Sequence, residues 1–341
     1  MATLKDIANK CNTSTATVSY VLSGMGEERR ISAAMQERVL QAAQELDYRY
    51  TPRMRDNHLP KIAIYWPQRY LEMMMPPFIN GLNSALFMSP NAVEVSIHPF
   101  EQGFLSAQNH LWQTGSADAA VIVSAGVQDM EILRRKKTAM PTILMNRSME
   151  GYYCVTIGQY EAGVMAARHA ISRAGDDIML VMPAVDLYGA NLRGKAIRET
   201  CRKYGVDLSR NIVYCSVDIE EGHALGRRLY LENRLHKVII CLFDMAALGI
   251  TSALVEAGVK IGKDVEIISM NSSYQQLIAR MYSGLTVVDL RMEDVANMTI
   301  NLAIDLAVKK NEEPRSIVLH PRMIYRKSSP LFDDFPSDIQ E

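Results

Sequence analysis

The chain has 341 residues, of which 48% are hydrophobic, and its 37 Lys and Arg nearly balance its 38 Asp and Glu. A chain of this length and hydrophobicity buries substantial cores and is expected to form two or three domains. The formal net charge of −1 excludes nucleic-acid binding through an overall excess of positive charge. Any binding to nucleic acid must therefore depend on a local surface.

The five cysteines form no pattern of disulfides or metal ligands. They stand at positions 11, 154, 201, 215 and 241, without C-x-x-C spacing and without paired histidines at metal-binding spacing. We therefore expect reduced thiols in a cytoplasmic protein, with no bound metal and no cofactor. No apolar run approaches the ~18 residues of a membrane span, so we expect none.

Three short helices are predicted over residues 3–48, with Thr3 and Ser32 as N-cap candidates for the first and third. A polar turn at 12–14 separates the first helix from the second, which turns Tyr20 outward. Two short helices joined by such a turn and braced by a third describe a helix-turn-helix unit, although an unrelated three-helix bundle has the same periodicity. The predicted core positions are Leu4, Ile7, Ala8, Cys11, Val18, Val21, Leu22, Val39, Ala42, Ala43 and Leu46.

These residues carry a resemblance to a known family. The motifs L-K-D-I-A at 4–8, N-T-S-T-A-T-V-S-Y-V-L-S-G at 12–24 and R-V-L-Q-A-A-Q-E-L-D-Y at 38–48 closely resemble the headpiece of LacI-type (LacI/GalR family) bacterial transcription regulators. The resemblance implies a DNA-binding headpiece at 1–48 and double-stranded operator DNA as its partner. It further implies major-groove contacts from Thr15, Ala16, Ser19 and Tyr20, and phosphate contacts from Thr3, Ser14 and Thr17.

Residues 49–60 form a linker with a basic edge, punctuated by Pro52 and Pro60. In the resembled family this position holds a hinge helix that folds on DNA and inserts a leucine into the minor groove. The family's hinge arginine aligns with Arg55, but Asn57 replaces the leucine, which leaves Met54 or Leu59 as a substitute wedge. A plain basic tether is the alternative interpretation. The predicted DNA contacts of the linker are Arg49, Met54 and Arg55.

From residue 61 onward, short apolar runs alternate with amphipathic helices. This alternation is typical of parallel sheets built from β-α-β units, and two comparable series predict two similar α/β lobes. The predicted strands are 62–66, 93–97, 119–124, 142–145, 178–182, 212–215, 238–243 and 265–270. The predicted helices are 78–88, 105–113, 130–137, 161–173, 192–204, 221–233, 246–256 and 293–309.

This segment resembles the periplasmic-binding-protein-like effector domain of the same regulators. The matching motifs are D-A-A-V-I-V-S at 118–124, I-L-M-N-R-S at 143–148, L-R-G-K-A-I at 192–197, F-D-M-A-A-L-G at 243–249 and P-R-M-I-Y-R-K-S-S at 321–329. The resemblance implies an effector-binding and dimerisation domain at 61–329 and leaves 330–341 as an acidic tail. Its N-lobe would span about 61–157 and 288–317, and its C-lobe about 158–287 and 318–329, with three crossings of the chain.

Polar residues at the predicted strand ends are the candidates for contacts with a small-molecule effector, since ligands of such sheets bind outside the carboxyl ends of the strands. Arg193 matches the family's ligand-binding arginine, and Asp244 matches the acid before the A-L-G helix, where a helix N-cap is the alternative role. Tyr70 and Phe78 are wall candidates, although Phe78 is equally explained as a core residue. The full predicted effector set is Tyr70, Phe78, Asn146, Arg193, Asp244 and Asn271.

The predicted effector site is less acidic than a typical sugar site of the family. Asn146 and Asn271 stand where many members carry aspartates, and Gly158-Gln159 replaces a frequent Asp-Asn pair. The two leading hypotheses are therefore a repressor controlled by a sugar or related metabolite, and a regulator of the same fold with a non-sugar ligand or none. Both imply a homodimer that presents two headpieces to a pseudo-palindromic operator.

No catalytic motif is present in the sequence. It contains no G-x-S-x-G, H-E-x-x-H, P-loop or dinucleotide glycine fingerprint, so we expect no catalytic residues and no enzyme activity. Residues 11–26, which contain the whole predicted reading helix, have no charged side chain. Family members often carry an arginine at the position of Tyr20, so we expect an atypical operator sequence.

Overall fold

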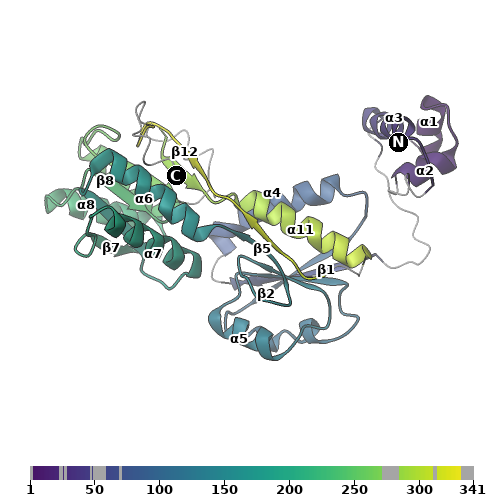
Figure 1. The fold of residues 1–341 in the computed structure, drawn as a ribbon, viewed down its shortest axis with the longest axis horizontal. Coiled ribbons are helices and arrows are strands. Elements are labelled where there is room, and N and C mark those ends of the chain that lie inside the picture. Colours follow the sequence, from purple (N-terminus) through teal and green to yellow (C-terminus); the bar gives the residue numbers. More distant parts are fainter. Residues whose placement is uncertain are drawn as a thin grey trace. The chain divides into compact units, whose positions relative to one another are not determined.

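The computed structural model describes residues 3–22, 26, 29–46, 48, 59–68, 71–270, 284–309 and 313–331. The described chain forms three helices at its N-terminus and two sheets with covering helices (Figure 1). The predicted class, an all-α headpiece followed by two α/β lobes with largely parallel sheets, is confirmed.

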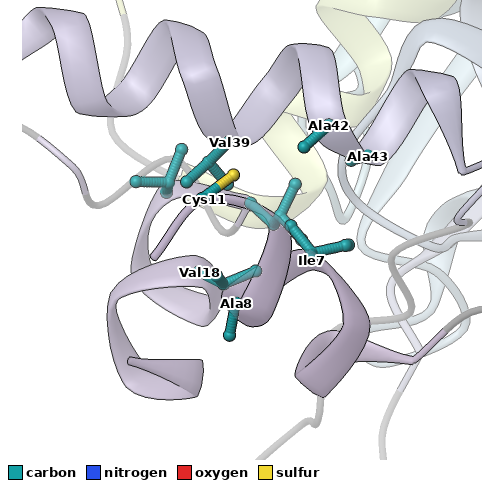
Figure 2. Close-up of a cluster of buried hydrophobic side chains, with 9 residues drawn as sticks. Ile7, Ala8, Cys11, Val18, Val39, Ala42 and Ala43 are labelled. Atoms are coloured by element: carbon teal, nitrogen blue, oxygen red, sulfur yellow. The ribbon is translucent and has the colours of Figure 1, made fainter. Parts of the chain in front are cut away.

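The headpiece consists of α1 (Leu4–Lys10), α2 (Thr15–Leu22) and α3 (Ala33–Glu45). Its core contains nine buried residues, all among the predicted core positions, and the predicted Leu4 and Leu46 pack against it partly buried (Figure 2). Because these side chains recur at i, i+3, i+4 and i+7, each helix brings one apolar stripe to the common centre. The core residues are Ile7, Ala8, Cys11, Val18, Val21, Leu22, Val39, Ala42 and Ala43.

The first sheet has six strands in the described residues, in the order β11-β5-β4-β3-β1-β2. Strand β1 pairs in parallel with β2 and with β3, and β5 pairs in parallel with β11. The strands are β1 (Lys61–Pro67), β2 (Glu94–Phe100), β3 (Ala119–Val123), β4 (Thr142–Met145), β5 (Tyr153–Ile157) and β11 (Ser316–Leu319).

The second sheet also has six strands in the described part of the chain, in the order β12-β10-β9-β8-β6-β7. All its pairs are parallel except β10 with β12. The strands are β6 (Ile178–Pro183), β7 (Ile212–Cys215), β8 (Val238–Cys241), β9 (Glu266–Met270), β10 (Thr286–Asp289) and β12 (Arg322–Ile324).

The helices that accompany the sheets follow the predicted alternation, with earlier starts in several cases. Helix α4 begins before Pro76 and Pro77 rather than after them. A helix that runs through prolines loses only the backbone hydrogen bonds that their nitrogens would have donated, together with some straightness. The helices are α4 (Leu71–Met88), α5 (Val127–Arg135), α6 (Gln159–Ala174), α7 (Tyr188–Lys203), α8 (Ile219–Leu231), α9 (Asp244–Glu256) and α11 (Met292–Lys309).

Two sequence predictions of secondary structure are wrong. The predicted helix at 105–113 is two short 3-10 turns, Leu105–Ala107 and Asn109–Trp112. The buried carboxylate of Asp129 accepts hydrogen bonds from the backbone N–H groups of Gly103 and Leu105, so a distant side chain determines the path here. The set of predicted strands is also incomplete, because it lacks β5, β10, β11 and β12. Strands β5 and β11 pair with each other, as do β10 and β12, across long stretches of sequence that local patterns do not connect.

A buried ionic network lies beside the second sheet. Arg173, in the last turn of α6, donates to both carboxylate oxygens of Glu266 at the start of β9, through Nε at 2.8 and 3.0 Å. Ser329 donates its hydroxyl to the same carboxylate at 2.7 Å, and His169 Nε2 lies 2.9 Å from the Ser329 Oγ. The network therefore joins α6, β9 and the segment that follows β12.

Protonation of His169 is expected to destabilise the fold. Burial lowers its pKa below the ordinary 6.5, with a smaller lowering by Arg173, whereas Ser329 and Glu266 oppose the fall. The Tyr325 ring packs edge-on at 5.0 Å. Because the folded pKa lies below the unfolded pKa, the unfolded chain binds the proton more tightly. The stability contributed by neutral His169 is therefore complete above pH 6.5 and is lost progressively as the pH falls below it.

Melting temperatures between pH 7.5 and 5 check this expectation. The His169→Gln variant should lose stability with falling pH less steeply than the unmodified protein. Equal slopes in both proteins would mean that another group carries the acid sensitivity.

Candidate DNA-reading face and effector site

Helix α2 presents the face that the sequence predicts to read DNA. Thr15 and Ala16 are exposed, while Ser19 and Tyr20 are half-buried and Val18 points into the headpiece core. The helix contains no charged residue of its own. Its outward surface therefore consists of small polar groups, one methyl group and one tyrosine ring.

Tyr20 has a cationic neighbour that the sequence did not reveal. The guanidinium carbon of Arg29, from the segment between α2 and α3, lies 4.8 Å from the centroid of the Tyr20 ring. Arg29 is exposed. The predicted reading face thus carries a positive charge supplied from outside the helix.

Two of the three residues predicted to contact phosphates, Thr3 and Ser14, already accept capping hydrogen bonds at helix starts, and the third, Thr17, is bonded to Ser14. Thr3 and Asp6 form a capping box at α1, in which the Thr3 hydroxyl donates to the Asp6 carboxylate at 2.7 Å. This hydrogen bond is the main reason why the pKa of Asp6 is lowered. Ser14 Oγ accepts the backbone N–H of Thr17 at 3.0 Å and lies 2.9 Å from the Thr17 hydroxyl. Their phosphate contacts remain predictions.

Five predicted site residues lie outside the described residues, so the structure gives no view of them. They are the linker residues Arg49, Met54 and Arg55, the wall candidate Tyr70 and the strand-end residue Asn271.

Arg193 on α7 is the centre of the candidate effector site. It is 8% exposed, and its guanidinium donates to the Gln159 side chain and, at 3.3 Å, to the carbonyl oxygen of Leu242. Its Nε is buried with no hydrogen-bond partner among the described residues. Burial lowers the pKa of Arg193 to about 10, against the opposing charge of Asp244, so the guanidinium stays protonated at neutral pH.

Two glycines allow the packing that holds Arg193. A Cβ at Gly163 on α6 would lie 2.4 Å from the backbone oxygen of Arg193, so only glycine permits this approach of α6 to α7. A Cβ at Gly189 would come within 3.1 Å of the Gln159 side chain and 3.2 Å of Arg193 Nη1. The absence of both side chains keeps the guanidinium and the Gln159 amide in contact.

Asp244 is a buried carboxylate and not a helix N-cap. Helix α9 begins at Asp244 itself and its N-cap is Phe243, so the alternative role considered from the sequence is wrong. Its Oδ1 accepts the hydroxyl of Ser269 at 2.7 Å, and its charge acts on both Arg193 and Arg326. Two arginines therefore share one carboxylate.

Asn146 follows β4 with a φ of +61°, in the left-handed region that asparagine tolerates better than most residues. Its Oδ1 is buried without a hydrogen-bond partner in the described structure. Arg147 donates to the Asn146 carbonyl oxygen at 2.7 Å, and its guanidinium lies 4.5 Å from the ring centroid of Tyr188, the first residue of α7. Asn146 is thereby linked to the helix that carries Arg193.

Phe78 is 1% exposed within α4, which favours its interpretation as a core residue. Four contributors were not among the predicted site residues: Arg147, Tyr188, Ser269 and Arg326. Ser269 offered a signal, because it is a lone polar residue in a buried apolar strand. The other three offered none, since charged and aromatic residues at such places are common.

The described residues contain no cluster of three His, Cys, Asp or Glu that would hold a metal ion. All five cysteines are buried, and burial raises the pKa of Cys201 and of Cys215 to about 11, so neither thiol is activated. Within the described part of the chain, no helix is long and apolar enough to cross a membrane.

The fold and the site define a two-lobed ligand-binding domain joined to a helix-turn-helix unit. Residues 3–50 match the family of bacterial regulatory proteins named for lacI, and residues 167–329 match the periplasmic binding protein-like domain. The chain belongs to the LacI family of DNA-binding transcription regulators.

Relatives of known role cover nearly the whole chain. The transcriptional repressor PurR of Pasteurella multocida is 23% identical over 96% of this chain and 98% of its own length. PurR of Escherichia fergusonii is 22% identical over 96% and 97%.

Solved structures of the family share the fold. A LacI family transcription regulator from Clostridium acetobutylicum is 25% identical, with a TM-score of 0.73 over 78% of this chain and 99% of that one. The lac repressor dimer bound to operator and the anti-inducer ONPF is 16% identical, with a TM-score of 0.66 over 97% and 99%. A regulator from Enterococcus faecium with bound ribose is 18% identical, with a TM-score of 0.65 over 80% and 100%.

Proposed function

We propose that this protein is a repressor that binds operator DNA through α2 and whose affinity for DNA is set by a small molecule bound around Arg193. The observation that carries the DNA-reading role is the outward polar face of α2 on a well-packed three-helix headpiece. Thr15, Ala16, Ser19 and Tyr20 are the proposed base contacts, suited to thymine methyl groups and single hydrogen bonds. The protein acts by binding alone, in the cytoplasm where its DNA lies.

Two copies of the chain are proposed to act together. A dimer offers two headpieces to the two halves of an operator, and the second then binds at a high effective concentration. This arrangement compensates for the modest charge of each headpiece, since residues 1–60 hold eight Lys and Arg against seven Asp and Glu. Sedimentation equilibrium of the full chain should give twice the monomer mass.

Replacement of Tyr20 by alanine is expected to abolish sequence-specific DNA binding without unfolding the headpiece, because Tyr20 is not part of the buried core. Duplexes selected by the unmodified protein from a randomised pool serve as operators. The variant should fail to retard them beyond its retardation of unrelated DNA, while its circular dichroism is unchanged. If the variant selects the same sequence as the unmodified protein, Tyr20 does not read bases.

The effector is proposed to be a hydroxyl-rich metabolite such as a sugar. Arg193 Nε offers a buried donor and Asn146 Oδ1 a buried acceptor, neither with a hydrogen-bond partner in the described structure. A hydroxyl group both donates and accepts, so a polyhydroxyl ligand carries groups that match either atom. The ribose-bound relative from Enterococcus faecium supports this class of ligand.

A second candidate is an anionic, non-sugar ligand. The charge of Asp244 opposes the desolvation of Arg193, and Asp244 also acts on Arg326, on which Asp289 acts more strongly. Arg193 therefore shares its carboxylate with a second arginine. Asn146 contributes an amide rather than a carboxylate. A ligand with carboxylate or phosphate oxygens would give Arg193 a further charge partner.

A thermal-shift panel of sugars, sugar phosphates and other anionic metabolites distinguishes the two ligand classes. A ligand at a hundredfold excess over its Kd stabilises the folded protein by about 2.7 kcal/mol. We expect Arg193→Ala to lose the shift and Lys195→Ala, an exposed position on the same helix, to keep it. If no compound raises the melting temperature of the unmodified protein, control by a ligand is ruled out for this panel and the effector proposal falls.

A further inference from the structure

The Arg29–Tyr20 stack carries an inference about how the headpiece reads DNA. Arg29 comes from the segment that connects α2 to α3, yet its guanidinium lies over the ring of a residue on the outward face of α2, at 4.8 Å from the centroid. A cation over a tyrosine face is held by the ring quadrupole, with an attraction that survives in water. The contact therefore places the charge beside the proposed reading residues.

The charge of Arg29 is not neutralised within the described structure. No carboxylate of the described residues pairs with it, and no described acceptor takes a hydrogen bond from it. Lys10 in the same headpiece differs, because it forms an ion pair with Glu45 at 2.6 Å. Stacking engages the flat face of the guanidinium and leaves the N–H groups on its edge available.

We propose that Arg29 is a base-reading residue that donates two parallel hydrogen bonds to O6 and N7 of a guanine in the major groove, with Tyr20 as the platform that positions it. The inference rests on the proposed DNA-reading role of α2. Guanine offers the two adjacent acceptors that match the guanidinium fork, and the uncharged helix α2 has no other side chain able to make this contact.

Base reading fits the geometry better than a phosphate contact does. A phosphate also accepts the guanidinium fork, but its oxygens can be approached from many directions, so the contact does not need a side chain held in one orientation. A guanine requires a planar fork held in one orientation. The Tyr20 ring provides that restraint, since a stacked guanidinium loses less freedom when it forms its two hydrogen bonds.

The test compares three variants of the full-length protein that differ in charge and shape. Arg29→Lys keeps the charge but loses the fork, and Arg29→Gln loses both. Arg38→Gln removes a charge that is also exposed, from α3, and serves as the control. Each protein selects duplexes from a randomised pool, and its affinity for the selected sequence is measured across a salt series.

We expect Arg29→Gln to lose preference for guanine at one position of each half-site, by roughly tenfold, whereas Arg29→Lys, which keeps the charge but not the fork, should retain part of that preference with an unchanged salt dependence. Arg38→Gln should select the same sequence as the unmodified protein. Substituting 7-deazaguanine at that position removes the N7 acceptor, so it should weaken the unmodified protein and leave Arg29→Gln unaffected.

Two results overturn the inference. If Arg29→Gln selects the unchanged sequence, Arg29 does not read a base. If Arg29→Gln weakens binding equally for all sequences and reduces the salt slope by about one, Arg29 contacts a phosphate. Failure of the proposed function looks different, because the unmodified protein would then select no sequence at all.

Discussion

Replacing Val18 by aspartate is expected to abolish DNA binding while the effector domain stays folded. Val18 is fully buried on the inner face of α2, in the core shared by all three headpiece helices (Figure 2). An unpaired carboxylate in that core costs about 3–5 kcal/mol, and a unit this small has little stability in reserve. The unfolded headpiece then presents no reading helix.

Gel retardation of the selected operator measures DNA binding, and calorimetry measures whether the effector domain is folded. The variant should give no retarded band at concentrations where the unmodified protein retards all the DNA, and the main calorimetric transition should remain. Leu40→Asp is the matched control, because Leu40 is 54% exposed on α3 and its replacement leaves the core intact. Specific DNA binding by Val18→Asp would contradict the assignment of the headpiece core.

Removing the side chain of Arg173 is expected to destabilise the domain of the second sheet by about 3–5 kcal/mol. The Glu266 carboxylate is 2% exposed and depends on Arg173 for its charge partner, so Arg173→Ala leaves a buried charge without compensation. This loss of stability arises more from leaving the buried Glu266 carboxylate unpaired than from losing its attraction to Arg173. It also loosens the Ser329 hydroxyl, which donates to the same carboxylate.

Chemical denaturation of the full chain checks this magnitude. Arg135→Ala provides the control, because its ion pair with Glu131 has side chains 77% and 45% exposed and contributes little in water. Combining Arg173→Ala with Glu266→Gln should recover part of the lost free energy of unfolding, since the charge is then gone. A loss below ~1 kcal/mol for Arg173→Ala would show that water reaches Glu266.

Local patterns in the sequence were sufficient for the headpiece and for most of the strand–helix alternation. The apolar spacing from Ile7 to Ala43 predicts the core because the helical period alone brings those side chains to one side. The same reasoning failed at 105–113, where Asp129 holds the backbone of Gly103 and Leu105 from another part of the chain. Periodicity carries no information about such a contact.

The candidate effector site was predictable in its centre and not in its surroundings. Arg193 and Asp244 were identified from motifs, and the structure brings their charges into interaction. The role of Asp244 was open, because a carboxylate before a helix is equally suited to capping. In the structure α9 begins at Asp244 itself, and the Ser269 hydroxyl donates to the Asp244 carboxylate, so Asp244 is a buried partner and not a cap.

The sequence by itself determined that a helix-turn-helix unit precedes a two-lobed α/β domain, since helical spacing and strand–helix alternation are local properties. The tertiary structure alone decided which distant groups meet: Arg173 with Glu266, Gln159 with Arg193, and Arg29 with Tyr20. Such pairs form only where the folded chain brings separate segments together. For that reason the predicted reading helix, which has no charge of its own, lies beside a cation from outside its length.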